Sequence, residues 1–423
     1  MFTEKPMRSL LAIILVVSVL MTLTGCVVRV DSDEYMTREQ VDALLKQSMI
    51  GNVTVEGGDN YNVNIDGAEN ANMLAAAKGV LSAVSITCYF EYKTGYGPSY
   101  SSQKTENRKG AGVIYKLDKE QGDAYIITNY HVVYEESANT EGHISKRIYA
   151  ELYGMENCGM EISCEYVGGS MLYDLAVLKV DGSRIIAESN AVAASFGDSG
   201  EVSVLDTAIA IGNPEGDGIS ATVGYVNVDS EYIDLVGVDN KTKITLRVMR
   251  IDTAVNHGNS GGGLFNDRGE LIGIVNAKTV DSSVENIGYA LPSSLVRAVV
   301  ENILYYCDGT DTTSVRRALV SINLDVEKYY TVYDTETGRV HKKEIVRIAS
   351  VTPGGAAEMR LLSGDIIRAV VIDGVRFEAD RMHKVTECML YARVGSSVVF
   401  EITRAGVEMN VTIPVSEAML TDW

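Results

Sequence analysis

Positive charge is scarce in this sequence. Its 423 residues include 37 lysines and arginines against 57 aspartates and glutamates, which gives a formal net charge of −20 at pH 7. The phosphates of a nucleic acid would be repelled by such a surface. The sequence also has no basic cluster, no P-loop and no dinucleotide-binding fingerprint. We therefore exclude nucleic acid as a partner and expect no cofactor.

Histidine and cysteine are also rare. No two of the five histidines have the spacing of metal ligands, so we expect no metal site. Setting Cys26 aside leaves an odd number of cysteines, of which Cys158 and Cys164 are near enough to bridge across a loop. The others are typical of buried apolar positions. No cysteine lies in a glycine-rich exposed setting, which argues against a cysteine nucleophile.

The strongest chemical signal lies around Ser260, within Gly258-Asn259-Ser260-Gly261-Gly262-Gly263. Small neighbours leave the serine hydroxyl uncovered, and glycine permits the backbone angles that aim successive amide N–H groups at one point. Acyl transfer needs both an exposed oxygen nucleophile and donors that wait for the oxyanion. Taken alone the segment also fits an ordinary turn, so its interpretation depends on partners elsewhere in the chain.

Two residues upstream supply these partners. His131 follows the apolar run 125–127 and a polar pair, and Asp174 opens the apolar run 175–178. An aspartate at the head of a buried strand can accept a hydrogen bond from an imidazole, which fixes the tautomer that takes a serine proton. The chain order is His, Asp, Ser, which is the order of the chymotrypsin-like double barrel.

Two alternative interpretations, an α/β-hydrolase fold and a nucleophile at Ser199, disagree with the neighbouring sequence. The α/β-hydrolase elbow also reads G-x-S-x-G, but it requires the order Ser, acid, His and a helix after the serine. Here Ser260 is followed by glycines and by a hairpin pattern that turns at 267–269. Ser199, in Gly197-Asp198-Ser199-Gly200, resembles a trypsin-type nucleophile but lies too soon after Asp174 for most of a second barrel to intervene. We interpret Ser199 as a turn residue.

Several motifs in this order resemble the HtrA/Deg family of trypsin-like serine proteases. They are Thr128-Asn129-Tyr130-His131-Val132-Val133, Asp174-Leu175-Ala176-Val177-Leu178-Lys179-Val180, Ala210-Ile211-Gly212-Asn213-Pro214, Val255-Asn256-His257-Gly258-Asn259-Ser260-Gly261-Gly262 and Gly269-Glu270-Leu271-Ile272-Gly273-Ile274. The resemblance implies that His131 is the general base, Asp174 its orienting acid and Ser260 the nucleophile. It also implies an oxyanion hole at Gly258 and Ser260, with Asn259 between them.

Short strands separated by turn residues predict a mostly β fold, an all-β barrel or sandwich. The resemblance implies a chymotrypsin-like double six-stranded β-barrel followed by a PDZ-like α+β domain. We expect a signal peptide at 1–25, a linker at 26–75, the protease domain at 76–306, a second linker at 307–316 and the PDZ-like domain at 317–416. Within the linker, 52–56 and 61–65 alternate as in an exposed hairpin. Within the PDZ-like domain, 379–392 is the one clear helix.

The N-terminus indicates export. Lys5 and Arg8 precede an apolar run that ends in Leu23-Thr24-Gly25-Cys26. This ending resembles the bacterial lipobox, which implies that Cys26 is lipidated and becomes the mature N-terminus. An uncleaved transmembrane anchor is the alternative. In both cases we expect the catalytic part in the cell envelope, on the extracytoplasmic face of the membrane.

Substrate contacts are predicted in two places. Candidates for the pocket of the side chain before the scissile bond are Ala254, Val255, Ile274 and Val275; residues 253–256 carry no acid, so we expect small or medium aliphatic side chains there. The family's PDZ carboxylate loop corresponds to Leu319-Val320-Ser321-Ile322, where Ser321 replaces a usual glycine. That replacement puts capture of peptide C-termini in doubt.

The predicted function is ATP-independent peptide-bond hydrolysis, through an acyl-enzyme, of unfolded or misfolded exported proteins. The resemblance implies a homotrimer or a multiple of one, for which Tyr89, Phe90 and Tyr92 are candidate interface aromatics. Two alternatives are a chaperone-like holdase and a membrane-tethered PDZ stress sensor with little proteolysis.

Overall fold

The structure is a computed structural model that describes residues 53–56, 62–65, 71–94, 102–156, 158–277, 287–307 and 314–423. The predicted signal peptide and Cys26 lie outside these residues. Within the described ranges, no helix is both long enough and apolar enough to cross a membrane. The expected hairpin in the N-terminal linker is present, because β1 (Val53–Glu56) pairs antiparallel with β2 (Asn62–Ile65).

The first barrel closes in the order β3-β4-β5-β8-β7-β6. Its strands are β3 (Ala83–Thr94), β4 (Ser102–Asp118), β5 (Asp123–Thr128), β6 (Arg147–Leu152), β7 (Ile162–Ser170) and β8 (Leu175–Val180). Alternate side chains fill the interior, as the strand period of two requires. Phe90 is among them and is fully buried, which corrects its assignment as an interface aromatic. Cys88 and Cys164 are buried, and neither they nor Cys158 form a disulfide.

The second barrel closes in the order β10-β11-β14-β13-β12-β9. Its strands are β9 (Thr207–Gly212), β10 (Ser220–Val236), β11 (Lys243–Ile251), β12 (Gly263–Phe265), β13 (Leu271–Val275) and β14 (Gly288–Pro292). The two closed six-stranded barrels confirm the predicted chymotrypsin-like architecture. The hairpin of β12 and β13 confirms the hairpin predicted after Ser260.

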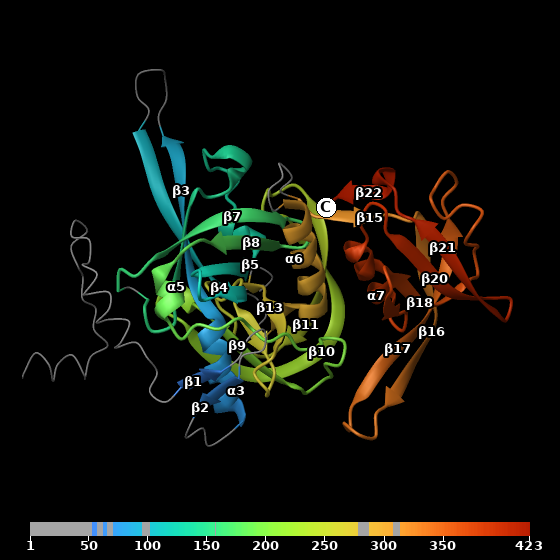
Figure 1. Ribbon diagram of the computed structural model, residues 1–423, viewed down its shortest axis with the longest axis horizontal. Helices are drawn as coiled ribbons and strands as arrows, with labels where there is room; N and C mark the ends of the chain where they lie inside the picture. The colour runs from blue at the N-terminus through green and yellow to red at the C-terminus, as the bar shows by residue number, and fades with distance from the viewer. Residues whose placement is uncertain are drawn as a thin grey trace, which may run out of the picture.

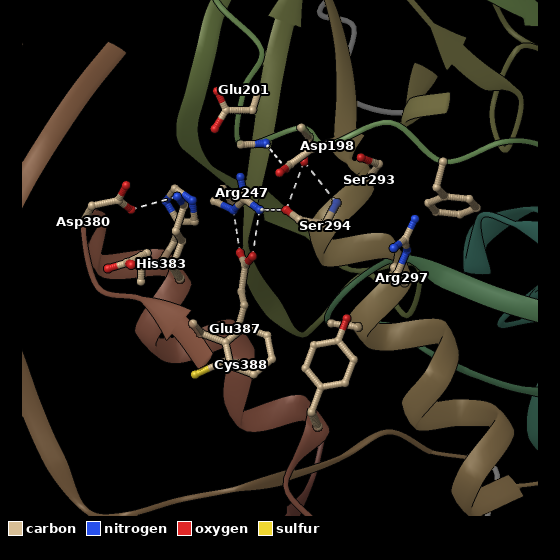
Figure 2. A pocket seen from close by; sticks show the side chains of 18 of the residues that line it. Asp198, Glu201, Arg247, Ser293, Ser294, Arg297, Asp380, His383, Glu387 and Cys388 are labelled. Atoms are coloured by element: carbon tan, nitrogen blue, oxygen red, sulfur yellow. Dashed lines mark hydrogen bonds and ion pairs between the residues drawn. The ribbon is translucent and has the colours of Figure 1, made fainter. Parts of the chain in front are cut away.

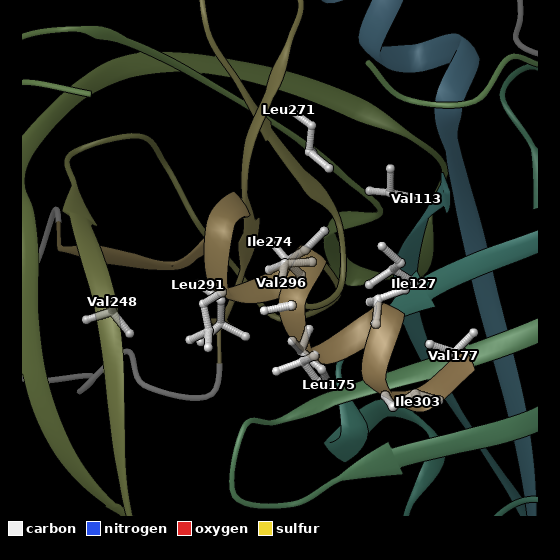
Figure 3. Close-up of a cluster of buried hydrophobic side chains, with 14 of the residues drawn as sticks. Val113, Ile127, Leu175, Val177, Val248, Leu271, Ile274, Leu291, Val296 and Ile303 are labelled. Carbon is white, nitrogen blue, oxygen red and sulfur yellow. The ribbon is translucent and has the colours of Figure 1, made fainter. Parts of the chain in front are cut away.

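A shared core lies between the two barrels (Figure 3). Strand β9 is buried on both faces, since Ala208 and Ala210 point into the second barrel while Ile209 and Ile211 face this shared core. Two helices cover it, namely α3 (Ala71–Ser82) and α6 (Ser293–Cys307). Helix α3 begins inside the segment that we expected to be linker, and its Ala75 belongs to the same core.

The C-terminal region forms a separate β-rich unit, drawn in orange and red in Figure 1. Its sheet has the order β16-β17-β18-β20-β21, with β19 paired to β18, and a second small sheet joins β15 to β22. The strands are β15 (Arg316–Ala318), β16 (Ile322–Tyr333), β17 (Val340–Val351), β18 (Ile366–Ile372), β19 (Val375–Glu378), β20 (Ser397–Arg404), β21 (Val407–Pro414) and β22 (Leu420–Asp422).

The helix predicted at 379–392 is shorter than expected. Helix α7 spans Met382–Glu387, and a 3₁₀ turn, η4 (Cys388–Tyr391), follows it. Its expected first turn is extended instead, because the Ala379 amide donates to Arg368 O and Asp380 O accepts from the Glu344 amide. These sheet-type hydrogen bonds satisfy the backbone groups that a helix would otherwise need.

Candidate active site

His131 is held by the end of a strand and by a short helix. Strand β5 ends at Thr128, and α4 (Tyr130–Val133) presents the imidazole. Between them, the buried Asn129 donates from Nδ2 to Asp174 O at 2.8 Å. The polar pair that interrupts this apolar run in the sequence therefore fixes the turn that aims the histidine.

Asp174 is almost fully buried and accepts hydrogen bonds on both carboxylate oxygens. Its Oδ1 accepts from the His131 amide at 3.0 Å, and its Oδ2 lies 2.7 Å from His131 Nδ1. A third donor is Asn276 Nδ2, which is 2.8 Å from Oδ2. With Nδ1–H directed at the carboxylate, His131 Nε2 is the nitrogen that is free to accept a proton.

Asn276 was not predicted to serve the candidate triad. It follows the fully buried strand β13, and its side chain reaches Asp174 across 102 positions of sequence. A polar residue immediately after a run of five buried side chains was the available signal. That signal indicates a buried polar partner, but it does not say which group is the partner.

Ser260 sits where the two barrels meet. Its carbonyl oxygen accepts from the Ala111 amide on β4 at 2.9 Å, and the Gly261 amide donates to Val275 O at 3.0 Å. Gly261 has φ +85°, and a Cβ there would lie 2.2 Å from Ala111 O. No side chain fits at this junction, so the glycine after the serine is a packing requirement as well as a conformational one.

The Ser260 hydroxyl is turned toward the neighbouring strand. Ser260 Oγ accepts from the Ala277 amide at 3.2 Å. Among the described residues, Ser260 and His131 form no hydrogen bond with each other. Catalytic hydrogen bonds are often long or poorly aligned before a substrate binds.

The loop before Ser260 has the geometry of an anion site. Gly258 has φ +96°, and a Cβ there would lie 2.1 Å from Asn213 O. The adjoining carbonyls are held away from the serine, since Glu215 N donates to His257 O at 2.8 Å and Asn213 N to Gly258 O at 3.3 Å. In the described structure, the Gly258 and Ser260 amides donate to no protein acceptor. Two such amides match the donors that an oxyanion requires.

Of the four candidates for the substrate side-chain pocket, Val255 packs against the cluster in the second barrel that includes Val275. Ala254 is exposed and Val255 is half-buried, both just upstream of the Gly258 loop. Ile274 is fully buried in the core between the barrels, and Val275 points into the second barrel. Adjacent residues of a strand face opposite sides, and here both sides are core. We therefore assign Ile274 and Val275 to the hydrophobic core.

The predicted carboxylate loop borders a groove in the C-terminal unit. The groove has a volume of about 450 Å³ and runs between β16 and α7, with Ser321, Ile322, Met382, Val385 and Phe400 among its lining residues. Leu319 is exposed and Val320 is buried. Ser321 has φ +60°, the left-handed conformation that glycine adopts freely.

A larger cavity, of about 600 Å³, lies between the second barrel and α7 (Figure 2). It contains none of the three candidate catalytic residues. Ser199 lines it and caps α6, since its hydroxyl accepts from the Ser294 amide at 3.0 Å and donates to Ser294 Oγ. Ser199 lies in a turn, as predicted, and the cap on α6 is an additional structural role.

Two closed antiparallel barrels, with an Asp–His pair and a glycine-flanked serine at their junction, define a trypsin-like peptidase. The trypsin-like peptidase domain family matches residues 110–274. The serine protease Do-like HtrA of Bacillus subtilis is 33% identical over 331 residues, which cover 76% of this chain and 67% of that protein. The chain belongs to the HtrA family, and it is a serine endopeptidase.

Other relatives match shorter stretches. The serine protease Do-like HtrB of Bacillus subtilis is 37% identical over 196 residues, which cover 46% of this chain and 38% of that protein. The solved structure of the HtrA-type protease AlgW with decapeptide superimposes with a TM-score of 0.49 at 24% identity, over 82% of this chain and 98% of that chain. The family assignment rests on the Bacillus subtilis HtrA relative.

Proposed function

We propose that this endopeptidase cleaves unfolded or misfolded exported proteins, without ATP, through an acyl-enzyme formed on Ser260. The observation that carries the proposal is the hydrogen-bonded Asp174–His131 pair beside a serine whose loop leaves two amide donors unused. Nucleophile, base and oxyanion donors are the three parts that acyl transfer needs.

In the proposed reaction, Ser260 Oγ attacks the scissile carbonyl while its proton passes to His131 Nε2. Asp174 stabilises the imidazolium and remains a carboxylate. The Gly258 and Ser260 amides bind the oxyanion, and each such donor contributes about 3 kcal/mol to the stability of the transition state. His131 then gives its proton to the leaving amine, and water releases the acyl group by the same steps.

The test is cleavage of unfolded casein by the full chain and its Ser260→Ala variant. We expect the variant to lose activity by about 10⁴-fold or more while keeping its fold. Ser199→Ala is the matched control, since Ser199 only caps α6, and it should retain turnover. Mass spectrometry of the products should show cuts after valine, alanine, leucine or isoleucine, as Ala254 and Val255 predict. Cleavage by Ser260→Ala would overturn the assignment.

We also propose that residues 317–416 are a PDZ-like domain that binds peptide C-termini in the groove between β16 and α7. The positive φ of Ser321 supports this, because a left-handed residue leaves the loop backbone in the shape that glycine gives it. Added-strand binding to an exposed sheet edge would supply the remaining contacts.

Binding of a decapeptide that ends in valine tests this proposed capture of peptide C-termini. We expect it to bind the Ser260→Ala protein, and its C-terminal amide to bind at least about tenfold more weakly, because the amide lacks the charge that backbone donors favour. Isothermal titration calorimetry measures both affinities. Ser321→Gly should keep the affinity, since glycine adopts φ +60° without strain. Equal affinity for acid and amide would exclude carboxylate capture.

We also propose that the protein is exported and lipid-anchored, and that it assembles as a trimer. The apolar run that ends at Cys26 supports export and lipid anchoring at the extracytoplasmic face of the membrane. Relatives include the probable periplasmic serine endoprotease DegP-like of Rhizobium meliloti and the periplasmic endoprotease DegQ of Escherichia coli. The trimer stays a family-based prediction, for which the partly exposed Tyr89 and Tyr92 remain candidates after the burial of Phe90.

A further inference from the structure

Trp423, the only tryptophan in the chain, lies against the protease barrels and far in sequence from the catalytic residues. It follows β22, which pairs with β15, and its amide donates to Val315 O at 2.6 Å. The end of the chain therefore lies between the barrels and the C-terminal sheet (Figure 1). The indole packs on the edge of the core that the two barrels share.

Arg317 joins this indole to the first barrel. Its guanidinium carbon is 3.6 Å from the centroid of the Trp423 ring, and its Nη1 donates to Tyr173 Oη at 3.3 Å. The Tyr173 and Trp423 ring centroids are 6.3 Å apart. A half-buried guanidinium over an indole is a favourable contact that holds both groups in one arrangement. Arg317 from β15 and Trp423 at the end of the chain thus both contact Tyr173 of the first barrel.

Tyr173 is the residue immediately before Asp174. Asp174 has φ +50°, a left-handed conformation that is unfavourable for most non-glycine residues. Its amide donates to Met171 O at 3.3 Å, which closes the turn that carries the carboxylate toward His131. A strained residue keeps its conformation only where its surroundings fix it. Hydrogen bonds from Asn129, His131 and Asn276 hold Asp174 itself. The contacts of the Tyr173 side chain fix the residue that precedes Asp174.

We propose that Tyr173, Arg317 and Trp423 are positioning residues for Asp174, so that strand β22 and Trp423 complete the active site from outside the barrels. The inference rests on the proposed triad of Asp174, His131 and Ser260. Loss of the Arg317 and Trp423 contacts with Tyr173 lets the turn at 171–174 relax. The Asp174 carboxylate then moves from its position beside His131 Nδ1. An error of about 1 Å in such a group can reduce turnover by up to about 10²-fold.

The experiment compares Trp423→Ala with Trp423→Phe in the full chain, by steady-state cleavage of a fluorogenic unfolded casein. We expect Trp423→Ala to lower kcat by about tenfold with KM unchanged within twofold, because the substrate contacts are elsewhere. Trp423→Phe keeps an aromatic face for Arg317 and should restore kcat to within about threefold of the starting protein. Rates are expressed per folded molecule, measured by circular dichroism. An unchanged kcat in Trp423→Ala would overturn the inference.

Two arginines on the same strand provide a matched control. Arg316 precedes Arg317 on β15, but it pairs with Glu417 and lies over Tyr306. We expect Arg317→Leu to lower kcat and to shift the emission maximum of the single tryptophan, and Arg316→Leu to do neither. Equal losses in both variants would mean that β15 is merely loosened, and would contradict a positioning role.

The Ser260→Ala variant distinguishes a failure of the proposed triad from a failure of the positioning role. If it stays active, the triad itself is wrong and the positioning inference falls with it. If it is inactive while Trp423→Ala and Arg317→Leu keep full kcat, only the positioning inference fails. Labelling of Ser260 by a fluorophosphonate gives an independent readout, since the labelling rate follows activation of the serine by His131. It should fall in Trp423→Ala and recover in Trp423→Phe.

Discussion

At the scale of single residues, the candidate site depends on partners that bury Asp174. The carboxylate accepts from the His131 amide, from His131 Nδ1 and from Asn276 Nδ2. A buried carboxylate that loses one of these donors carries an unpaired lone pair, and its orientation is less tightly fixed. Asn276 thus orients Asp174 from the second barrel, whereas Tyr173 positions it from the first.

We predict that Asn276→Ala lowers kcat by about tenfold and leaves KM within twofold, because the lost hydrogen bond orients the acid and touches no substrate. Steady-state cleavage of unfolded casein measures both constants. Asn323→Ala, which removes an exposed amide bonded to Ser350, is the control and should be neutral. A normal kcat in Asn276→Ala would show that the Asn276 hydrogen bond is not needed to orient Asp174.

At the scale of elements, α6 fixes how the barrels pack. Its buried residues, which include Leu295, Val296, Val299 and Ile303, join the core shared by both barrels (Figure 3). The helix approaches β7 closely where Gly168 has no side chain. A Cβ at Gly168 would lie 2.7 Å from Cys307 Sγ and 3.1 Å from Ile303 Cγ2.

Gly168→Ala should therefore destabilise the protein by about 1–3 kcal/mol, the usual cost of overpacking a core. Urea unfolding followed by circular dichroism measures the change. In a Cys307→Ala background the penalty should shrink, because the closest atom is removed. A Gly168→Ala penalty of the same size in both backgrounds would mean that the contact with Cys307 Sγ is not the cause, since the Cys307 Cβ, at 2.9 Å, is kept in alanine.

At the scale of the whole molecule, charged side chains join the C-terminal unit to the second barrel. Arg247 on β11 is buried and binds Glu387 on α7 through two hydrogen bonds, Nε to Oε1 at 2.5 Å and Nη2 to Oε2 at 2.7 Å, and it also donates to Ser294 Oγ (Figure 2). Arg381 reaches Asp229 at 3.0 Å, and Arg339 reaches Asp206 at 3.1 Å. Removal of one partner from a buried pair leaves an uncompensated charge, so this interface is sensitive to any change of charge.

His383 lies in this interface and makes it sensitive to acid. Burial, followed by the nearby cations Arg247, Arg381 and Lys384, lowers the pKa of His383 to about 2 from an ordinary 6.5. Asp380 and Glu387 on the same segment are engaged by Lys384 and Arg247. The folded state keeps the imidazole neutral, whereas the unfolded state binds a proton below about pH 6.5. The His383 contribution to stability is therefore complete above pH 6.5 and is lost progressively as the pH falls toward 2.

We predict that protonation of His383 in the unfolded state lowers the free energy of unfolding by about 1 kcal/mol for each pH unit below 6.5. Urea unfolding at these pH values should show a flatter dependence in His383→Gln than in the starting protein. His257→Gln, the same substitution at an exposed position, is the matched control. Parallel curves for the starting protein and His383→Gln would contradict the assignment.

The amino-acid sequence alone predicts a mostly β fold, the hairpin after Ser260 and the order His131, Asp174, Ser260. Each of these depends on strand periodicity, on turn residues or on glycine at a position with positive φ, and such preferences act between near neighbours. The same local signals predicted that Ile274 and Val275 line a substrate pocket, and that the helix containing α7 begins at 379. They could not show that both faces of β13 are core, or that sheet hydrogen bonds hold Ala379 and Asp380.

The folded arrangement of the chain sets which partners these residues have. Asn276 reaches Asp174 across 102 positions, and Arg317 reaches Tyr173 across 144. It also decided that Ser260 Oγ rests on the Ala277 amide, and that His383 is surrounded by cations from β11 and α7. These contacts arise because closing two barrels and docking a third unit bring distant segments within hydrogen-bond range. Local sequence preferences do not specify which distant segments become neighbours in the folded protein.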